Sequence, residues 1–179
     1  MKKKLAFLPN ALSFLNLCCG FFAISSVIRG SGEGRTVLCL IFLGGIFDGF
    51  DGFLARKLGA ESDFGKQLDS FADLLTFGMA PMVWVVGAVG EEMFNFTLAA
   101  SLIYVMAGIF RLTRYNVEPA SKMIKGLPIT AAGVFLTLFH YASYIRRDEE
   151  HFFTPIIMLG LAVLMVADTQ WLRKMGVGS

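Results

Sequence analysis

Four aspartates lie close together in one stretch of the sequence, with a spacing that suits metal binding. They are Asp48, Asp51, Asp69 and Asp73. Residues three or four apart share one face of a helix, so each pair can present both carboxylates in the same direction. Four clustered carboxylates must either take up protons or bind cations. All-oxygen ligation favours Mg²⁺, Mn²⁺ or Ca²⁺ over zinc, and two divalent ions would cancel all four charges.

Two metal ions in an oxygen cage are typical of phosphoryl transfer, because they bridge phosphate oxygens and hold the nucleophile and the leaving group in line. The residues beside the first aspartate pair fit such a substrate. Gly52 and Ala55 share the face of that pair and leave room for a ligand, while Arg56 supplies a cation suited to phosphate. Acids that only cap helix ends or pair with nearby cations would not explain four carboxylates at this spacing.

The composition places these acids in a membrane protein. The 179 residues are 55% apolar and 17% charged, with a mean hydropathy of +0.63, which suits lipid as the solvent. An ionisable side chain inside a membrane helix costs about 2.5 to 3.5 kcal/mol, so such residues indicate a functional site. The net charge of +2 and the dispersed basic residues do not indicate a nucleic-acid partner.

Six apolar stretches are long enough to cross a hydrocarbon core of about 30 Å, which takes about 20 helical residues. Turn-forming and charged residues separate them, and no gap could hold a second domain. Residues 1–179 are therefore predicted to form one all-helical, polytopic membrane domain. The first stretch is too long and too polar for a cleaved signal peptide, so it is expected to stay on the chain. The predicted spans are 10–28, 36–55, 68–89, 95–112, 127–145 and 152–172.

The lysines and arginines orient these spans. Six spans place both termini on one side, and that side carries twelve of the sixteen basic residues, all except Arg29, Arg35, Arg146 and Arg147. The positive-inside bias therefore predicts that both termini and the acidic motif face the cytoplasm. The basic and apolar segment 2–7 is predicted to rest on the membrane surface as a short interfacial segment.

The aspartate motif resembles the signature of the CDP-alcohol phosphotransferase family. That signature reads D-x-x-D-G-x-x-A-R-x8-G-x3-D-x3-D, and all eight fixed positions match between Asp48 and Asp73. Other segments resemble the membrane subgroup that uses serine, and together the likeness covers most of the chain. The resemblance implies a six-helix fold that is usually a homodimer in the lipid bilayer. The additional segments are PNALSFLNLCCG, FGKQLDSFADLLTFGMAP, FRLTRYN and KGLP.

The resemblance also implies a reaction and a role for each acid. A phosphatidyl group would pass from CDP-diacylglycerol, or an ether-lipid equivalent, to the hydroxyl of L-serine with release of CMP. Asp48, Asp51 and Asp69 would bind two divalent cations, Mg²⁺ or Mn²⁺. Asp73 would contact metal and also act as the base, since metal and phosphate make the attacking hydroxyl more acidic. The residues implied to border the CDP group are Asn10, Ser13, Gly52, Ala55, Arg56 and Gly65.

Cations near the end of the fourth predicted span are candidates for binding serine. Arg111 and Arg114 lie three residues apart, Asn116 follows, and Lys125 precedes a Gly-Leu-Pro turn. A guanidinium can hold a carboxylate through two parallel hydrogen bonds. Such cations can also simply anchor helix ends at the membrane surface, and the resemblance favours the substrate-binding role.

Two other functions remain open from the sequence. A sister phosphotransferase that uses glycerol 3-phosphate or an inositol phosphate would need cations at the same places. A divalent-cation channel or carrier would also use intramembrane carboxylates. A conduit needs polar residues across the whole membrane, however, whereas these acids stay near one face. Phosphatidyl transfer to serine is therefore the favoured prediction.

Overall fold

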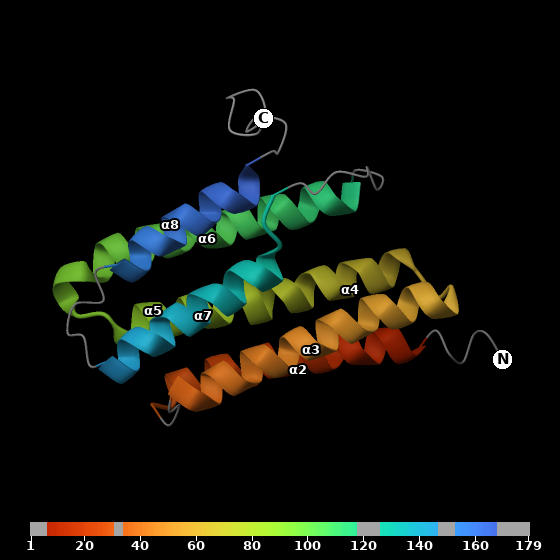
Figure 1. Cartoon of the computed structure of the whole chain (residues 1–179), viewed down its shortest axis with the longest axis horizontal. Coiled ribbons are helices and arrows are strands. Elements are labelled where there is room, and N and C mark those ends of the chain that lie inside the picture. Colours follow the sequence, from red (N-terminus) through yellow and green to blue (C-terminus); the bar gives the residue numbers. More distant parts are fainter. Residues whose placement is uncertain (1–6, 31–33, 118–125, 147–152, 168–179) are drawn as a thin grey trace.

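All elements in the described part of the chain are helices, as the sequence predicts (Figure 1). The computed structural model describes residues 7–30, 34–117, 126–146 and 153–167. The elements are α2 (Phe7–Ile28), α3 (Gly34–Leu58), α4 (Asp63–Asp73), the π-helical segment η1 (Leu74–Met79), α5 (Ala80–Ala88), α6 (Glu91–Val117), α7 (Ile129–Arg146) and α8 (Phe153–Val166).

Four helical stretches are long and apolar enough to cross a membrane. They are α2, α3, the continuous run Asp63–Ala88 that joins α4, η1 and α5, and α6. The described parts of α7 and α8 comprise 18 and 14 residues and are not in this group. Length and composition thus support the first four predicted spans, and the fifth and sixth remain predictions. The predicted interfacial segment lies outside the described residues, apart from Phe7.

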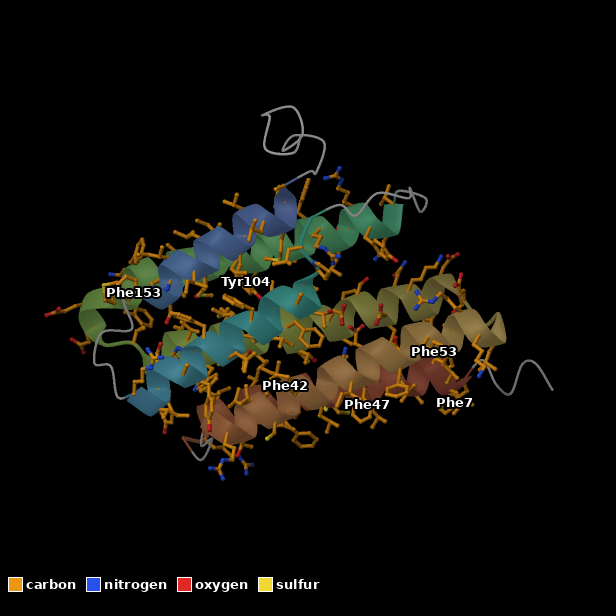
Figure 2. The ribbon with its side chains drawn as sticks, in the orientation of Figure 1. Phe7, Phe42, Phe47, Phe53, Tyr104 and Phe153 are labelled. Carbon is orange, nitrogen blue, oxygen red and sulfur yellow. The ribbon has the colours of Figure 1, made fainter. Side chains whose placement is uncertain are left out.

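The helices run side by side along the long axis of the molecule (Figure 1). α2 packs on both α3 and α4, α6 packs on α8, and α7 contacts α3, η1 and α8. The centre is apolar and includes the fully buried Tyr104, whereas Phe42 and Phe53 of α3 are 41% and 54% exposed (Figure 2). Large apolar side chains on the outside suit a helical bundle whose outer solvent is lipid.

The π-helical segment η1 follows Asp73 directly and packs closely on α2 and α3. The Thr76 hydroxyl donates to the backbone oxygen of Asn16 at 2.9 Å. A Cβ on Gly44 would lie 2.7 Å from Cγ2 of Thr76, so α3 can approach η1 this closely only with glycine at position 44. π-helical segments often occur next to functional sites. The position of η1 directly after Asp73 therefore indicates a functional site near this residue.

The connection between α3 and α4 is shorter than predicted. The charged residues 56–66 predict a polar connection, but α3 continues to Leu58 and α4 begins at Asp63. Two basic residues in the last turn of α3 favour the helix C-terminus, and Gly59 follows it with a positive φ of 57°. Ser62 caps α4 by accepting a hydrogen bond from the Gly65 amide at 3.0 Å. All four aspartates therefore lie within regular helix.

Candidate metal centre

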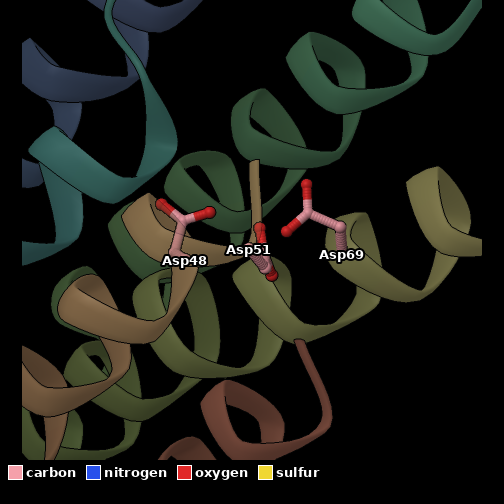
Figure 3. Close-up of side chains that lie close together, drawn as sticks. All are labelled: Asp48, Asp51 and Asp69. Carbon is pink, nitrogen blue, oxygen red and sulfur yellow. The ribbon is translucent and has the colours of Figure 1, made fainter. Parts of the chain in front are cut away.

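Three of the four aspartates meet at one point between α3 and α4. Asp48, Asp51 and Asp69 each place one carboxylate oxygen so that all three oxygens lie within 4.8 Å of one another (Figure 3). Asp48 and Asp51 come from neighbouring turns of α3, and Asp69 reaches them from α4. Asp51 is buried, while the other two are half-buried. The cluster is therefore shielded from solvent at Asp51 and partly accessible at Asp48 and Asp69.

Asp73 adjoins this cluster from the next turn of α4. Its side chain is 7% exposed, and it interacts electrostatically with all three other aspartates. The carboxyl group of Asp48 interacts with those of Asp69 and Asp73. The four acids thus form one negatively charged cluster, and a bound cation would offset the repulsion between the carboxylates.

The donor set fits a hard divalent cation. It consists of carboxylates alone, and oxygen ligands of this kind suit Mg²⁺ and Mn²⁺. Oδ1 of Asp69 is buried and has no hydrogen-bond partner among the described residues. A buried carboxylate oxygen without a partner is costly, and ligation of a cation would remove that cost. Asp48, Asp51 and Asp69 can therefore hold one such ion.

Neutral donors on other helices hold three of the four carboxylates. Each donor is a side chain on α2 or α7, so the cluster depends on the packing of four helices. Such neighbours orient metal ligands and fix their geometry. The hydrogen bonds are Ser13 Oγ to Asp51 Oδ2 at 2.6 Å, Asn16 Nδ2 to Asp73 Oδ1 at 3.2 Å and Thr130 Oγ1 to Asp48 Oδ2 at 3.1 Å.

Two residues predicted to border the CDP group lie on α2. The hydroxyl of Ser13 donates to Asp51 and also contacts the backbone oxygen of Pro9, so in this structure it supports the cluster directly. Asn10 lies against the start of α4, because a Cβ on Gly65 would be 2.8 Å from Oδ1 of Asn10. Asn10 and Gly65 are thus brought together at the end of the helices next to the cluster.

The other predicted CDP residues line α3 beyond the aspartates. A Cβ on Gly52 would meet no atom within 4 Å, so there is open space beside Gly52. Ala55 is half-buried and Arg56 is exposed. Contact between these three residues and a CDP group stays a prediction.

Arg111 is a predicted serine-binding residue that interacts with the acids through its charge. Its guanidinium interacts electrostatically with Asp73 and Asp48. Its Nε atom is buried and has no hydrogen-bond partner among the described residues. Arg111 therefore provides positive charge and an available donor next to the cluster.

The other predicted serine-binding residues are arranged differently. Asn116 is exposed, and its Nδ2 donates to Oγ of Ser70, the neighbour of Asp69, at 2.8 Å. Arg114 is half-buried on the same helix, and Lys125 lies outside the described residues. Asn116 therefore ties the end of α6 to α4 at the edge of the site.

The predicted site set did not include Asn16 or Thr130, although both contact the aspartates. Asn16 could have been found, because it is an amide within an apolar helix and lies one turn after Ser13. Thr130 carries no comparable signal. It reaches Asp48 only because α7 packs on α3.

Comparison with known proteins agrees with this site. Residues 6–167 match the family model of CDP-alcohol phosphatidyltransferase. The chain is 34% identical over 175 residues to archaetidylserine synthase from Methanothermobacter thermautotrophicus, covering 96% of this chain and 72% of that protein. It is 32% identical over 166 residues to CDP-diacylglycerol–serine O-phosphatidyltransferase from Bacillus subtilis, covering 90% and 87%. The chain therefore belongs to the CDP-alcohol phosphatidyltransferase family.

Proposed function

We propose that this protein is a phosphatidylserine synthase, which transfers the phosphatidyl group of CDP-diacylglycerol to the hydroxyl of L-serine and releases CMP. The observation that carries the proposal is the convergence of Asp48, Asp51 and Asp69 at one point in a member of this family. Serine is favoured as the acceptor because the relatives described above, which align with most of this chain, are named for it. An ether-linked lipid donor is the variant indicated by the archaetidylserine synthase relative.

The residues divide the chemistry among them. Asp48, Asp51 and Asp69, with Asp73, would hold two divalent cations, Mg²⁺ or Mn²⁺, and bound cations would neutralise the diphosphate and stabilise charge on the leaving CMP. The open space beside Gly52 would admit the nucleotide and diphosphate. Asp73 would take the proton of the serine hydroxyl while that oxygen bonds to the phosphatidyl phosphorus and the bond to CMP breaks.

The membrane arrangement is part of the proposal. The enzyme would cross the bilayer six times and act as a homodimer, with both termini and the aspartates at the cytoplasmic face. The bias of basic residues toward one side supports this orientation. The four helices that are long and apolar enough to span a membrane support the insertion into the bilayer. A cytoplasmic site would receive serine from the cytosol and the lipid donor from the inner leaflet.

A panel of acceptors tests the function. Purified protein in lipid vesicles would be incubated with CDP-diacylglycerol, Mg²⁺ or Mn²⁺, and serine, glycerol 3-phosphate or an inositol phosphate, and CMP would be measured. Of the three acceptors, we expect only serine to give CMP, and the lipid product should be phosphatidylserine. Turnover with another acceptor but not with serine would refute the acceptor assignment. Metal flux into the vesicles without CMP from any donor would instead support a cation channel or carrier.

Arg111→Ala is expected to raise the KM for serine by about tenfold to 100-fold, because a charge-assisted hydrogen bond contributes about 1.5 to 3 kcal/mol. The KM for the lipid donor should stay within about threefold, in keeping with an acceptor-binding role. Steady-state kinetics with each substrate varied in turn would measure both constants. Arg35→Ala, an exposed arginine in the first turn of α3, is the control. A large loss of kcat at unchanged KM would contradict acceptor binding by Arg111.

A further inference from the structure

Asn16 is completely buried in the middle of α2 and faces the carboxylate of Asp73. Its exposed fraction is 0%, and its Nδ2 donates to Oδ1 of Asp73 at 3.2 Å. A carboxylate can only accept hydrogen bonds, so the nitrogen end of the amide must point toward Asp73. A buried amide in an apolar helix is costly unless it is bonded. The contact with Asp73 therefore offsets part of this cost, while Oδ1 of Asn16 is buried and has no hydrogen-bond partner among the described residues.

The surroundings of Asn16 restrict where its amide can lie. Thr76, on η1, donates to the backbone oxygen of Asn16 at 2.9 Å and so fixes α2 against the segment that follows Asp73. A Cβ on Gly44 would lie 2.8 Å from Oδ1 of Asn16. Glycine at position 44 thus makes room for the amide, and the amide has little freedom to turn away from Asp73.

α2 also connects the two acidic helices. Ser13, one turn before Asn16, donates to Asp51 on α3, while Asn16 donates to Asp73 on α4. One face of α2 therefore sets a carboxylate on each of the two helices that form the cluster. These two hydrogen bonds from α2 to the acids indicate that Asn16 orients a carboxylate and is not merely a packing residue.

We propose that Asn16 is a positioning residue for Asp73, and this inference rests on the proposed function. By holding Oδ1, the amide fixes the rotation of the carboxylate, so that Oδ2 keeps one direction for proton transfer. Neighbours that orient functional side chains in this way typically contribute about 10-fold to 100-fold to activity. Because Asn16 lies behind Asp73 rather than in the open space beside Gly52, its effect should fall on the chemical step and not on substrate binding.

The test replaces the amide while keeping its size. Asn16→Leu and Asn16→Asp are expected to lower kcat by about 10-fold to 100-fold, with the KM for serine and for CDP-diacylglycerol within about threefold of the parent. The rate is normalised to the number of molecules that bind CDP-diacylglycerol, measured by titration without serine. Thr137→Val is the control, because Thr137 is equally buried but donates only within its own helix, to Gly133. It should keep the parental kcat per binding-competent molecule.

A second arm asks whether Asn16 acts through Asp73. In an Asp73→Asn background, Asn16→Leu should change the residual release of radiolabelled CMP by less than about twofold, because residues that act as one unit are not additive. A further loss equal to that in the parent enzyme would mean that Asn16 has a separate structural role. If Asn16→Leu fails to fold, the same comparisons are made with Asn16→Asp. Unchanged kcat in an otherwise active enzyme would refute the inference alone, whereas no CMP from the parental protein with any acceptor would refute the proposed function.

Discussion

Asp69→Asn is expected to abolish turnover and to weaken the binding of Mn²⁺ or Mg²⁺ by more than about 100-fold. Asp69 supplies the α4 side of the three-oxygen cluster, and its buried Oδ1 has no hydrogen-bond partner among the described residues. Removing one member of a buried charge pair costs about 3 to 5 kcal/mol, which corresponds to at least a hundredfold in affinity. Calorimetric titration with each cation and the rate of CMP release would measure the two effects.

The stability of this variant separates a metal centre from a group of acids with another role. Without divalent cations, Asp69→Asn should raise the unfolding temperature, because it relieves repulsion between carboxylates. Added Mn²⁺ should then stabilise the parental protein by mass action and leave the variant nearly unchanged. Asp63→Asn removes an exposed acid from the first turn of the same helix and is the matched control. Equal cation affinity in Asp69→Asn and the parental protein would contradict the assignment of the cluster.

The helical class and the pairing of the aspartates followed from local sequence patterns. The acids at positions 48 and 51, and at 69 and 73, have helical spacing, and the apolar runs around them predict helices long enough for a membrane. The short connection between α3 and α4 was harder to predict, because charged residues near helix ends resemble a loop. In the structure those charges occupy helix termini, where they interact favourably with the helix dipole.

The contacts that orient the carboxylates depend on tertiary packing. Thr130 lies 82 positions from Asp48 in sequence, and no local pattern indicates that these two side chains meet. The contacts of Ser13 and Asn116 also required the structure, since each donates to a specific side chain of the site, Asp51 and Ser70. Sequence spacing can place a residue on a helix face, but it does not determine which neighbouring helix covers that face.

Gly133→Ala is expected to destabilise the protein by about 1 to 3 kcal/mol, because it overpacks the contact between α7 and η1. The added Cβ would lie 2.5 Å from the backbone oxygen of Phe77 and 2.7 Å from its Cα. That backbone cannot rotate away as a flexible side chain would, and the same oxygen also accepts a hydrogen bond from Tyr104 at 2.9 Å. To relieve the overlap, α7 would have to move away from η1. The midpoint of thermal unfolding would measure the loss.

This displacement should also reach the active site. Thr130 lies one turn before Gly133 on α7 and donates to Asp48 at 3.1 Å, so a shift of α7 would break that bond and lower turnover. Thr130→Val removes the bond without overpacking, and it should lower turnover with a smaller change in unfolding temperature. Gly160→Ala on α8 is the control for adding a methyl group to a helix, because its Cβ would meet no atom within 4 Å. If Gly133→Ala unfolds at the same temperature as Gly160→Ala, then α7 does not pack on η1 this closely.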